Sequence, residues 1–470
     1  MLPLVLSLIS AAVARPHNGH PSQSPMWPLT INIDLSTRYQ TIDGFGFSEA
    51  FQRSSQLHGG FGLSPENQTR VLDYLFSNTT GMGATILRNG IGSSVDSSHD
   101  FMNSIEPVSP GSPSATPQYQ WDGNDTDQLW LSKVAQSYGV KTFYADAWSA
   151  PGFMKTNGND SNGGAICGVT DTDCATGDWR QAYADYLVQF VKFYRQAGVD
   201  ITHLGFLNEP DLNQTYASMQ SSGTQAADFL TVLYPTLQEQ GMGDIQIACC
   251  ENTGWSDTIT DLTEIQLAGA EDMLGIVTSH GYSSDPKAPL NTNKKVWQTE
   301  WADLNGRWNP RWDYLGKAGE GIAWANKVQD AMVLSNLSAW LYWQGAENST
   351  MNSMLIHLGH DDFEVSKRLW GIGQFSRFVR PGAVRIGAQV SGLPSGENGN
   401  LLYTSAFENL DGSVAIVSIN NAHADLNVQL NYPGTAEMWA TSEQYSIDNL
   451  GNVEGEAVVP KRTMVTWVFR

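Results

Sequence analysis

Residues 178–210 read DWRQAYADYLVQFVKFYRQAGVDITHLGFLNEP, and this stretch decides the fold. Between Tyr183 and Tyr194, large apolar residues recur every three or four positions, which is the spacing of one buried helix face. Gly198 then ends the helix. Residues 202–207 are a short apolar run, typical of a buried strand. The stretch therefore predicts a helix followed by a buried strand, the repeating unit of a parallel α/β sheet.

The same alternation continues on both sides, and we expect residues 40–380 to form one α/β domain. Eight strand-like runs separated by helices predict a closed (β/α)8 TIM barrel. The predicted strands cover residues 44–47, 85–88, 141–147, 202–207, 245–250, 276–280, 295–299 and 339–343.

The pattern changes after Arg380-Pro381-Gly382. From there to Arg470 the chain has only short alternating runs separated by Gly and Asn turns, which predicts an antiparallel β-sandwich side domain over residues 381–470. Residues 28–39 are also strand-like, and we expect this N-terminal strand to pair with the sandwich.

The N-terminus indicates export. Residues 1–14 form a short apolar run that ends in Ala-Val-Ala, as in a signal peptide, and residues 15–27 read as a spacer. The run is too short to span a bilayer. We therefore expect a secreted, extracellular glycoprotein. Seven sequons support this expectation: Asn67, Asn78, Asn124, Asn159, Asn213, Asn336 and Asn348.

Composition limits the kinds of molecule that the protein is expected to bind. A formal charge of −22 disfavours nucleic acid, whose phosphates would be repelled. The 16 Trp residues suit stacking on sugar rings, although ordinary core packing explains many of them. We expect a monomer with no nucleic-acid or membrane partner.

The four cysteines predict one bridge. Cys167 and Cys174 flank a short polar loop and could close a disulfide. Cys249 and Cys250 are adjacent, and neighbouring cysteines rarely bridge, so both are predicted to be small buried residues without a bond to each other. No Cys/His pattern resembles a zinc site, and we expect no metal.

Catalytic groups of a barrel lie where its strands end. Glu209 follows the fourth predicted strand and Glu300 the seventh. Two facing carboxyl groups are the minimal apparatus for glycoside hydrolysis, one to protonate the leaving oxygen and one to attack. We assign Glu209 as the acid/base and Glu300 as the nucleophile. The alternative is that Asn208-Glu209-Pro210 is only a turn that opens a helix and that Glu300 is only a surface charge. That alternative would explain either residue if it occurred alone.

Short runs near the ends of the predicted strands carry a family resemblance. They are Ile42-Asp43-Gly44-Phe45-Gly46, Leu87-Arg88, Trp148-Ser149-Ala150-Pro151-Gly152-Phe153-Met154-Lys155, Asn208-Glu209-Pro210, His280-Gly281-Tyr282, Thr299-Glu300-Trp301 and Phe375-Ser376-Arg377-Phe378-Val379-Arg380-Pro381-Gly382. Through these runs the chain resembles glycoside hydrolase family 30, most closely its fungal xylanase subfamily (subfamily 7), over nearly its whole length after the signal. In that family the Glu after the fourth strand is the acid/base and the Glu after the seventh is the nucleophile.

Further residues are candidates for substrate binding. Asn208 could hold a sugar 2-hydroxyl, a contact that strengthens in the transition state. Trp148 and Trp343 could stack on sugars, with core packing as the alternative. Tyr282, His280 and Arg88 could hydrogen-bond Glu300 and keep it ionised. For His280 and Arg88, a purely structural role is the alternative. This chemistry needs no cofactor.

Two features bear on specificity. Bacterial glucuronoxylanases of the family bind a glucuronate branch with an Arg in the loop after strand eight, but residues 344–353 contain no basic residue. Arg53, just beyond the first strand, is the candidate to replace it, with Arg307 and Arg311 in reserve. The second feature is a long Ser- and Pro-rich loop, residues 93–117, which either closes one end of the cleft or is a disordered insertion.

We therefore expect a retaining enzyme that cleaves β-1,4-xylan or glucuronoxylan by double displacement, as an endo-xylanase, a glucuronoxylanase or a xylobiose-releasing enzyme. The alternatives are the same fold acting as a β-1,6-glucanase, β-glucosidase or β-xylosidase, and a non-catalytic carbohydrate-binding protein. A serine hydrolase is disfavoured because the Gly-x-Ser-x-Gly elbow is missing.

Overall fold

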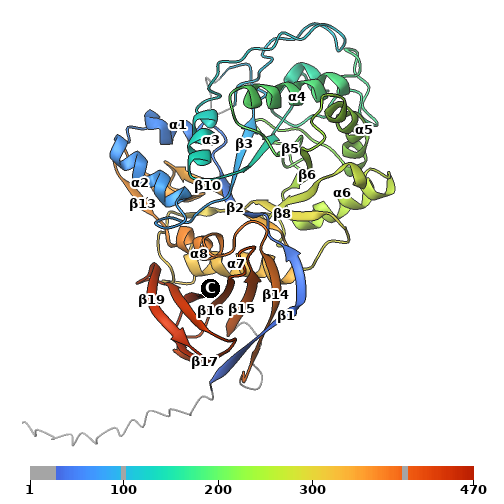
Figure 1. Ribbon diagram of the computed structural model, residues 1–470. Coiled ribbons are helices and arrows are strands. Elements are labelled where there is room, and N and C mark those ends of the chain that lie inside the picture. The colour runs from blue at the N-terminus through green and yellow to red at the C-terminus, as the bar shows by residue number, and fades with distance from the viewer. Residues whose placement is uncertain (1–27, 97–101, 394–400) are drawn as a thin grey trace, which may run out of the picture.

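The computed structural model describes residues 28–96, 102–393 and 401–470. The predicted signal peptide and spacer lie outside these residues. The chain forms a barrel and a β-sandwich packed side by side, with helices α7 (Gly321–Leu334) and α8 (Lys367–Ser376) between them (Figure 1).

The predicted TIM barrel is confirmed. Its strands are parallel and follow the order of the chain, and β10 pairs with both β8 and β2, which closes the ring. The strands are β2 (Gly44–Ser48), β3 (Ile86–Ile91), β4 (Thr142–Ala147), β5 (His203–Gly205), β6 (Gln246–Asn252), β7 (Ile276–His280), β8 (Lys295–Glu300) and β10 (Ala339–Glu347).

Amphipathic helices surround the barrel because each has one apolar face to bury. On α4 (Arg180–Gln196), that face includes Tyr183, Leu187, Phe190 and Tyr194. The other helices are α1 (Arg53–Ser55), α2 (Pro65–Phe76), α3 (Gln128–Ser137), α5 (Gly223–Glu239) and α6 (Trp255–Leu267), with short turns η1 (Gln56–Gly60), η2 (Gly152–Met154) and η3 (Glu271–Met273).

Four short strands have no counterpart in the sequence prediction. β9 (Asp303–Arg307) and β11 (Met351–Asn352) pair with each other, and so join the loops that follow the seventh and eighth barrel strands. β12 (Met354–Leu358) pairs with β10 and with β13 (Phe363–Val365). These segments are too short for a periodic pattern, so only their tertiary pairing identifies them.

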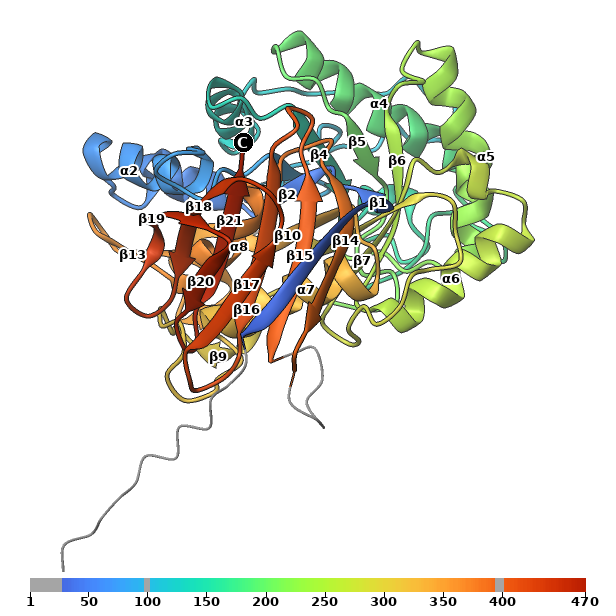
Figure 2. The same cartoon turned by 60° about the horizontal axis from the view of Figure 1, so that its bottom comes forward.

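The C-terminal region forms the predicted β-sandwich (Figure 2). Strand β1 pairs antiparallel with β14 and parallel with β17, which places the N-terminal strand in the sandwich. The strands are β1 (Leu29–Thr41), β14 (Val384–Ser391), β15 (Leu402–Glu408), β16 (Val414–Asn420), β17 (Leu426–Asn431), β18 (Thr435–Thr441), β19 (Ser446–Glu454), β20 (Glu456–Val459) and β21 (Met464–Phe469).

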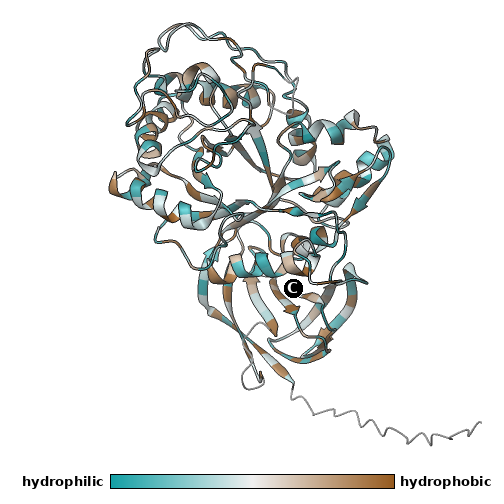
Figure 3. Ribbon diagram, turned by 180° about the vertical axis from the view of Figure 1, so that it is seen from behind, coloured by the Kyte–Doolittle hydropathy of each residue, from teal (hydrophilic) through white to brown (hydrophobic). Residues whose placement is uncertain are grey.

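The core of the barrel extends into the sandwich, which also has a core of its own. Successive side chains of a strand point to opposite faces. On β16, Ala415 and Val417 join the large core of the barrel, whereas Val414 and Ile416 join the sandwich's own core. Hydrophobic and hydrophilic positions alternate along the sandwich strands (Figure 3). The sandwich is therefore fixed to the barrel through α7 and α8.

The cysteines support one prediction and correct another. Cys167 and Cys174 form the predicted disulfide. Cys249 and Cys250 are buried as expected, but they are bonded to each other, so the prediction of two unbridged residues is wrong. The rule that neighbouring cysteines rarely bridge assumes a trans peptide, which holds neighbouring Cα atoms about 3.8 Å apart. Here the peptide is cis and the Cα atoms are 2.9 Å apart.

Five of the seven sequon asparagines are exposed, and Asn67 and Asn336 are half-buried. Their glycosylation stays a prediction. Within residues 28–96, 102–393 and 401–470, the helices are too short or too polar to cross a bilayer.

Candidate active site

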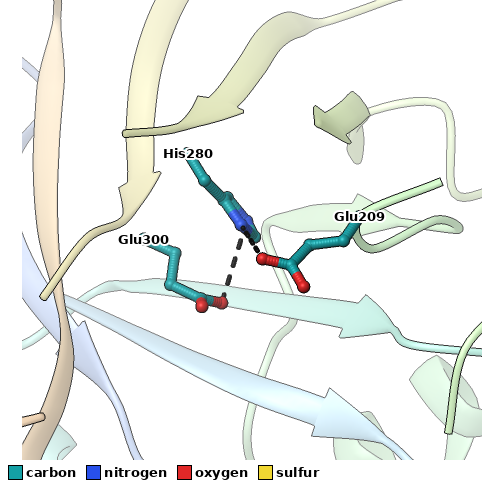
Figure 4. Close-up of side chains that lie close together, drawn as sticks. All are labelled: Glu209, His280 and Glu300. Atoms are coloured by element: carbon teal, nitrogen blue, oxygen red, sulfur yellow. Dashed lines mark hydrogen bonds and ion pairs between the residues drawn. The ribbon is translucent and has the colours of Figure 1, made fainter. Parts of the chain in front are cut away.

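The two predicted catalytic carboxylates meet at the carboxyl end of the barrel (Figure 4). Glu300 is the last residue of β8, and Glu209 stands four residues beyond the end of β5. An oxygen of each carboxylate and a ring nitrogen of His280 all lie within 4.8 Å of one another. Glu209 has a φ of 47°, in the left-handed region that non-glycine residues occupy rarely and at some cost.

Arg88 lies at the centre of a buried network beneath these groups. Its Nη1 donates to Glu300 at 2.5 Å, and its Nη2 donates to Asp146 and Asn208, both at 2.7 Å. The guanidinium also stacks on Trp148, 4.5 Å from the ring centroid. Arg88 therefore fixes the nucleophile candidate against the third and fourth strands.

Glu251, at the end of β6, is a third carboxylate that the sequence reasoning missed. It accepts hydrogen bonds from the Tyr144 hydroxyl at 2.5 Å and the Thr299 hydroxyl at 2.7 Å. Burial alone would raise the pKa of Glu251, but the positive charges of Arg88 and His280 lower it to about 2. Glu251 is thus a permanent anion of the network.

Asp146, at the end of β4, was also missed. Burial and the charge of Glu251 raise the pKa of Asp146 to about 8, so it is neutral in acid. Gly205 on the adjacent strand makes this packing possible, because a Cβ there would overlap the Asp146 carboxyl group.

His280 bridges the acidic groups. Its Nδ1 lies 3.2 Å from Glu209, and its Nε2 lies 2.6 Å from Glu251 and 3.7 Å from Glu300. Burial alone would lower the pKa of His280, but the three surrounding carboxylates raise it to about 10. Both ring nitrogens therefore carry protons. The ring can therefore donate a hydrogen bond to Glu209 and another to Glu251.

Glu300 receives two donors, Arg88 and the Tyr282 hydroxyl at 2.8 Å. Burial raises the pKa of Glu300, and the positive charges of His280 and Arg88 oppose that rise. Hydrogen bonds donated to a carboxylate favour its ionised form. On the other side of the pair, Tyr216 donates to Glu209 at 3.1 Å.

A cleft of about 800 Å³ opens above the carboxylates. It is lined by several of the predicted residues: Glu209, Glu300, Tyr282, Trp148, Trp343 and Arg53. Asn208, His280 and Arg88 are buried behind this lining. Phe51 packs edge-on against Trp148, Trp343 and Tyr216, which makes one wall aromatic.

Arg53 already has an acidic partner in the cleft. Its Nε lies 2.6 Å from Glu347, whose other oxygen accepts from Ser353 at 2.7 Å. The sequence reasoning noted the missing basic residue in the strand-eight loop but not this Glu. Arg307 and Arg311 are outside the cleft lining, and Arg311 pairs with Glu443.

The long loop is partly buried. Met102 is buried against Phe51 and Trp148, and Ile105 and Glu106 are buried further along, whereas Val95 and Val108 are exposed. Residues 97–101 lie outside the described part of the chain. The described residues of the loop do not line the cleft, and Met102 supports its aromatic wall from behind.

A (β/α)8 barrel with two facing carboxylates in an aromatic cleft defines a glycoside hydrolase. The chain belongs to glycoside hydrolase family 30. The model of O-glycosyl hydrolase family 30 matches residues 28–264, and that of the glycosyl hydrolase family 30 beta sandwich domain matches residues 382–467.

Several relatives match most of the chain. The catalytic domain of GH30 xylanase C from Talaromyces cellulolyticus is 44% identical, with a TM-score of 0.86 over 94% of this chain and 100% of that one. Endo-1,6-beta-D-glucanase BGN16.3 of Trichoderma harzianum is 24% identical over 97% of this chain and 90% of its own. Glucuronoxylanase XynC of Bacillus subtilis is 26% identical over 72% and 76%.

Proposed function

We propose that this glycoside hydrolase is a secreted, monomeric retaining xylanase that cleaves β-1,4-xylan or glucuronoxylan. The observation that carries the mechanism is the close approach of Glu209 and Glu300, within 4.8 Å, at the ends of the fourth and seventh barrel strands. The 44% identity to the catalytic domain of a xylanase supports the choice of substrate.

The reaction proceeds in two displacements. Glu300 attacks the anomeric carbon while Glu209 donates a proton to the leaving oxygen, which gives a covalent glycosyl-enzyme. Glu209, now a carboxylate, removes a proton from water, which attacks the same carbon and releases Glu300. Arg88 and Tyr282 hold Glu300 in place for the attack. No cofactor takes part.

The carboxylate spacing favours retention. Retaining glycosidases hold their carboxyl groups about 5–5.5 Å apart, whereas inverting enzymes need about 6.5–9.5 Å to admit a water molecule. One oxygen of each carboxylate lies within 4.8 Å of the other, a close approach that supports retention.

The surrounding residues have roles in substrate binding. Trp343 and Trp148 line the cleft, where their rings can contact the sugar. The Asn208 oxygen accepts from Arg88, which leaves its NH₂ group to donate to the 2-hydroxyl. Arg53 can release the Glu347 carboxylate and bind the carboxylate of a uronate in its place.

The second candidate is a β-1,6-glucanase. The endo-1,6-beta-glucanase of Trichoderma harzianum matches 97% of this chain, although at 24% identity. Reducing-sugar release from xylan and from β-1,6-glucan, measured in parallel, distinguishes the two substrates.

The mechanism is tested at Glu300. Glu300→Gln should abolish turnover on xylan while the protein stays folded, because an amide cannot form the glycosyl-enzyme. Azide should restore activity to Glu300→Gly and give a glycosyl azide of inverted configuration. NMR of the first product of the unaltered enzyme should show retained configuration. An active Glu300→Gln variant would refute the assignment of the nucleophile.

A further inference from the structure

The cleft has a second cationic side chain. Of the described residues that line it, Arg53 and Lys327 are positively charged, and Glu209, Glu300, Asp303 and Glu347 are acidic. In a protein of charge −22, an acidic substrate group needs a cation close by, because only contacts within about 8–10 Å escape screening by salt.

The two cations differ in how firmly they are paired. Arg53 contacts Glu347 at 2.6 Å, and the two side chains are only 18% and 8% exposed. The Lys327 ammonium lies 3.8 Å from Asp285, beyond hydrogen-bonding distance, and these side chains are 29% and 53% exposed. A partly exposed ion pair at this distance is worth little and exchanges readily.

Lys327 is held in place by aromatic rings. It projects from α7, and its Nζ lies 3.6 Å from the centroid of the Trp301 ring. Because Nζ covers that indole, a sugar at this point meets an ammonium group rather than a bare ring. Burial lowers the pKa of Lys327, while Asp285 and Asp330 oppose this, so the side chain is a cation in acid.

A chain of contacts connects Lys327 with the loops after the sixth, fifth and fourth barrel strands. Its partner Trp301 packs on Gly281, just beyond the sixth strand. From there, Ser283 donates to the Thr253 carbonyl at 3.0 Å, and the Thr253 backbone donates to Asp211 at 3.0 Å, two residues beyond Glu209. The proposed acid protonates the leaving oxygen, so this chain leads toward the leaving group. Arg53 pairs with Glu347 where the loops after the first and eighth strands meet.

We propose that Lys327 binds a carboxylate-bearing branch, such as a uronate, on the leaving-group half of the substrate. This inference rests on the proposed function and adds a second acid-recognition point besides Arg53. An ammonium binds a carboxylate as a point charge, so the branch position is read less strictly than by an arginine fork.

The test uses two variants and two substrates. Lys327→Met removes the charge and keeps an unbranched stem over Trp301, and Lys317→Met removes the same charge from an exposed lysine outside the cleft lining. The substrates are glucuronoxylan and the same polymer with its uronates reduced to neutral sugars. Lys327→Met should lower kcat/KM about 10-fold on glucuronoxylan and leave the reduced polymer unchanged. Lys317→Met should change neither.

Two further measurements complete the test. Products of glucuronoxylan should show fewer branches near the new non-reducing end with Lys327→Met, because that fragment was the leaving group. Equal losses on both polymers would overturn the proposal. If no xylan is cleaved, the proposed function fails separately, and binding of acidic and reduced xylo-oligosaccharides to Glu300→Gln, with and without Lys327→Met, still decides whether Lys327 recognises the carboxylate.

Discussion

At the scale of single residues, the site is a balanced set of buried charges. Arg88 and His280 are cations, Glu251 is an anion and Asp146 is neutral in acid. When Glu300 is ionised, its charge and that of Glu251 balance the two positive charges of Arg88 and His280. Burying an unpaired charge is costly, so this balance allows Glu300, the proposed nucleophile, to be ionised although it is buried.

The Tyr282 hydroxyl should set the acid limb of the pH–rate profile. Tyr282 donates to Glu300, and a hydrogen bond donated to a carboxylate favours its ionised form. Tyr282→Phe should therefore raise the pKa of Glu300 and move the acid limb of kcat/KM to higher pH. The pH–rate profile of the variant, compared with that of the unaltered enzyme, checks this. An acid limb that does not move would contradict the role of Tyr282.

At the scale of elements, the ends of the barrel strands carry the buried carboxylates of the site, and the loops support the walls of the cleft. Glu300, Glu251 and Asp146 stand at or next to the carboxyl ends of β8, β6 and β4. The loop after β3 reaches across to pack Met102 behind Phe51 and Trp148. The aromatic wall thus depends on a loop that does not itself line the cleft.

Met102→Ala should loosen that wall. Met102 is 1% exposed, and truncation of a buried Met costs about 2–5 kcal/mol of stability. We expect a lower midpoint of denaturant unfolding and a raised KM for xylan with a smaller change in kcat. Val95→Ala, in the same loop but 71% exposed, is the control and should change neither. An unaltered KM in Met102→Ala would mean that the loop does not support the wall.

At the scale of the whole molecule, one continuous core joins barrel and sandwich, and buried acids couple its stability to pH. Burial raises the pKa of Asp125 from 3.8 to about 7 and that of Asp261 to about 6. A raised pKa in the folded state means that the stabilisation is complete below pH 3.8 and is lost as pH rises through the folded value. Both groups therefore favour folding in acid.

Asp125→Asn isolates this effect, because Asn mimics the neutral acid that accepts from Tyr194 and Gln128. Relative to this variant, the unaltered protein should lose up to about 1.4 kcal/mol of unfolding free energy per pH unit between roughly pH 4 and 7. Denaturant unfolding across that range at constant ionic strength measures the difference. A difference that does not vary with pH would show that Asp125 is not protonated in the fold.

Much of the fold and half of the site could be predicted from the sequence. The eight barrel strands and the change to a β-sandwich follow from local periodicity, because burial on a helix or strand leaves a pattern within a few residues. Glu209 and Glu300 could be located because carboxyl ends of parallel strands converge. The same rule could have found Asp146 and Glu251, which lie at the carboxyl ends of equally clear strands.

Only the tertiary structure decided the rest. Arg53 pairs with Glu347, a residue 294 positions away in the sequence. Lys327 reaches the cleft from α7, and no sequence pattern in that helix predicts this. The protonation of Asp146 and His280 depends on which charges surround them once water is excluded. Periodicity is a property of neighbours along the chain, whereas charge pairing and pKa arise from groups that become neighbours only when the barrel closes.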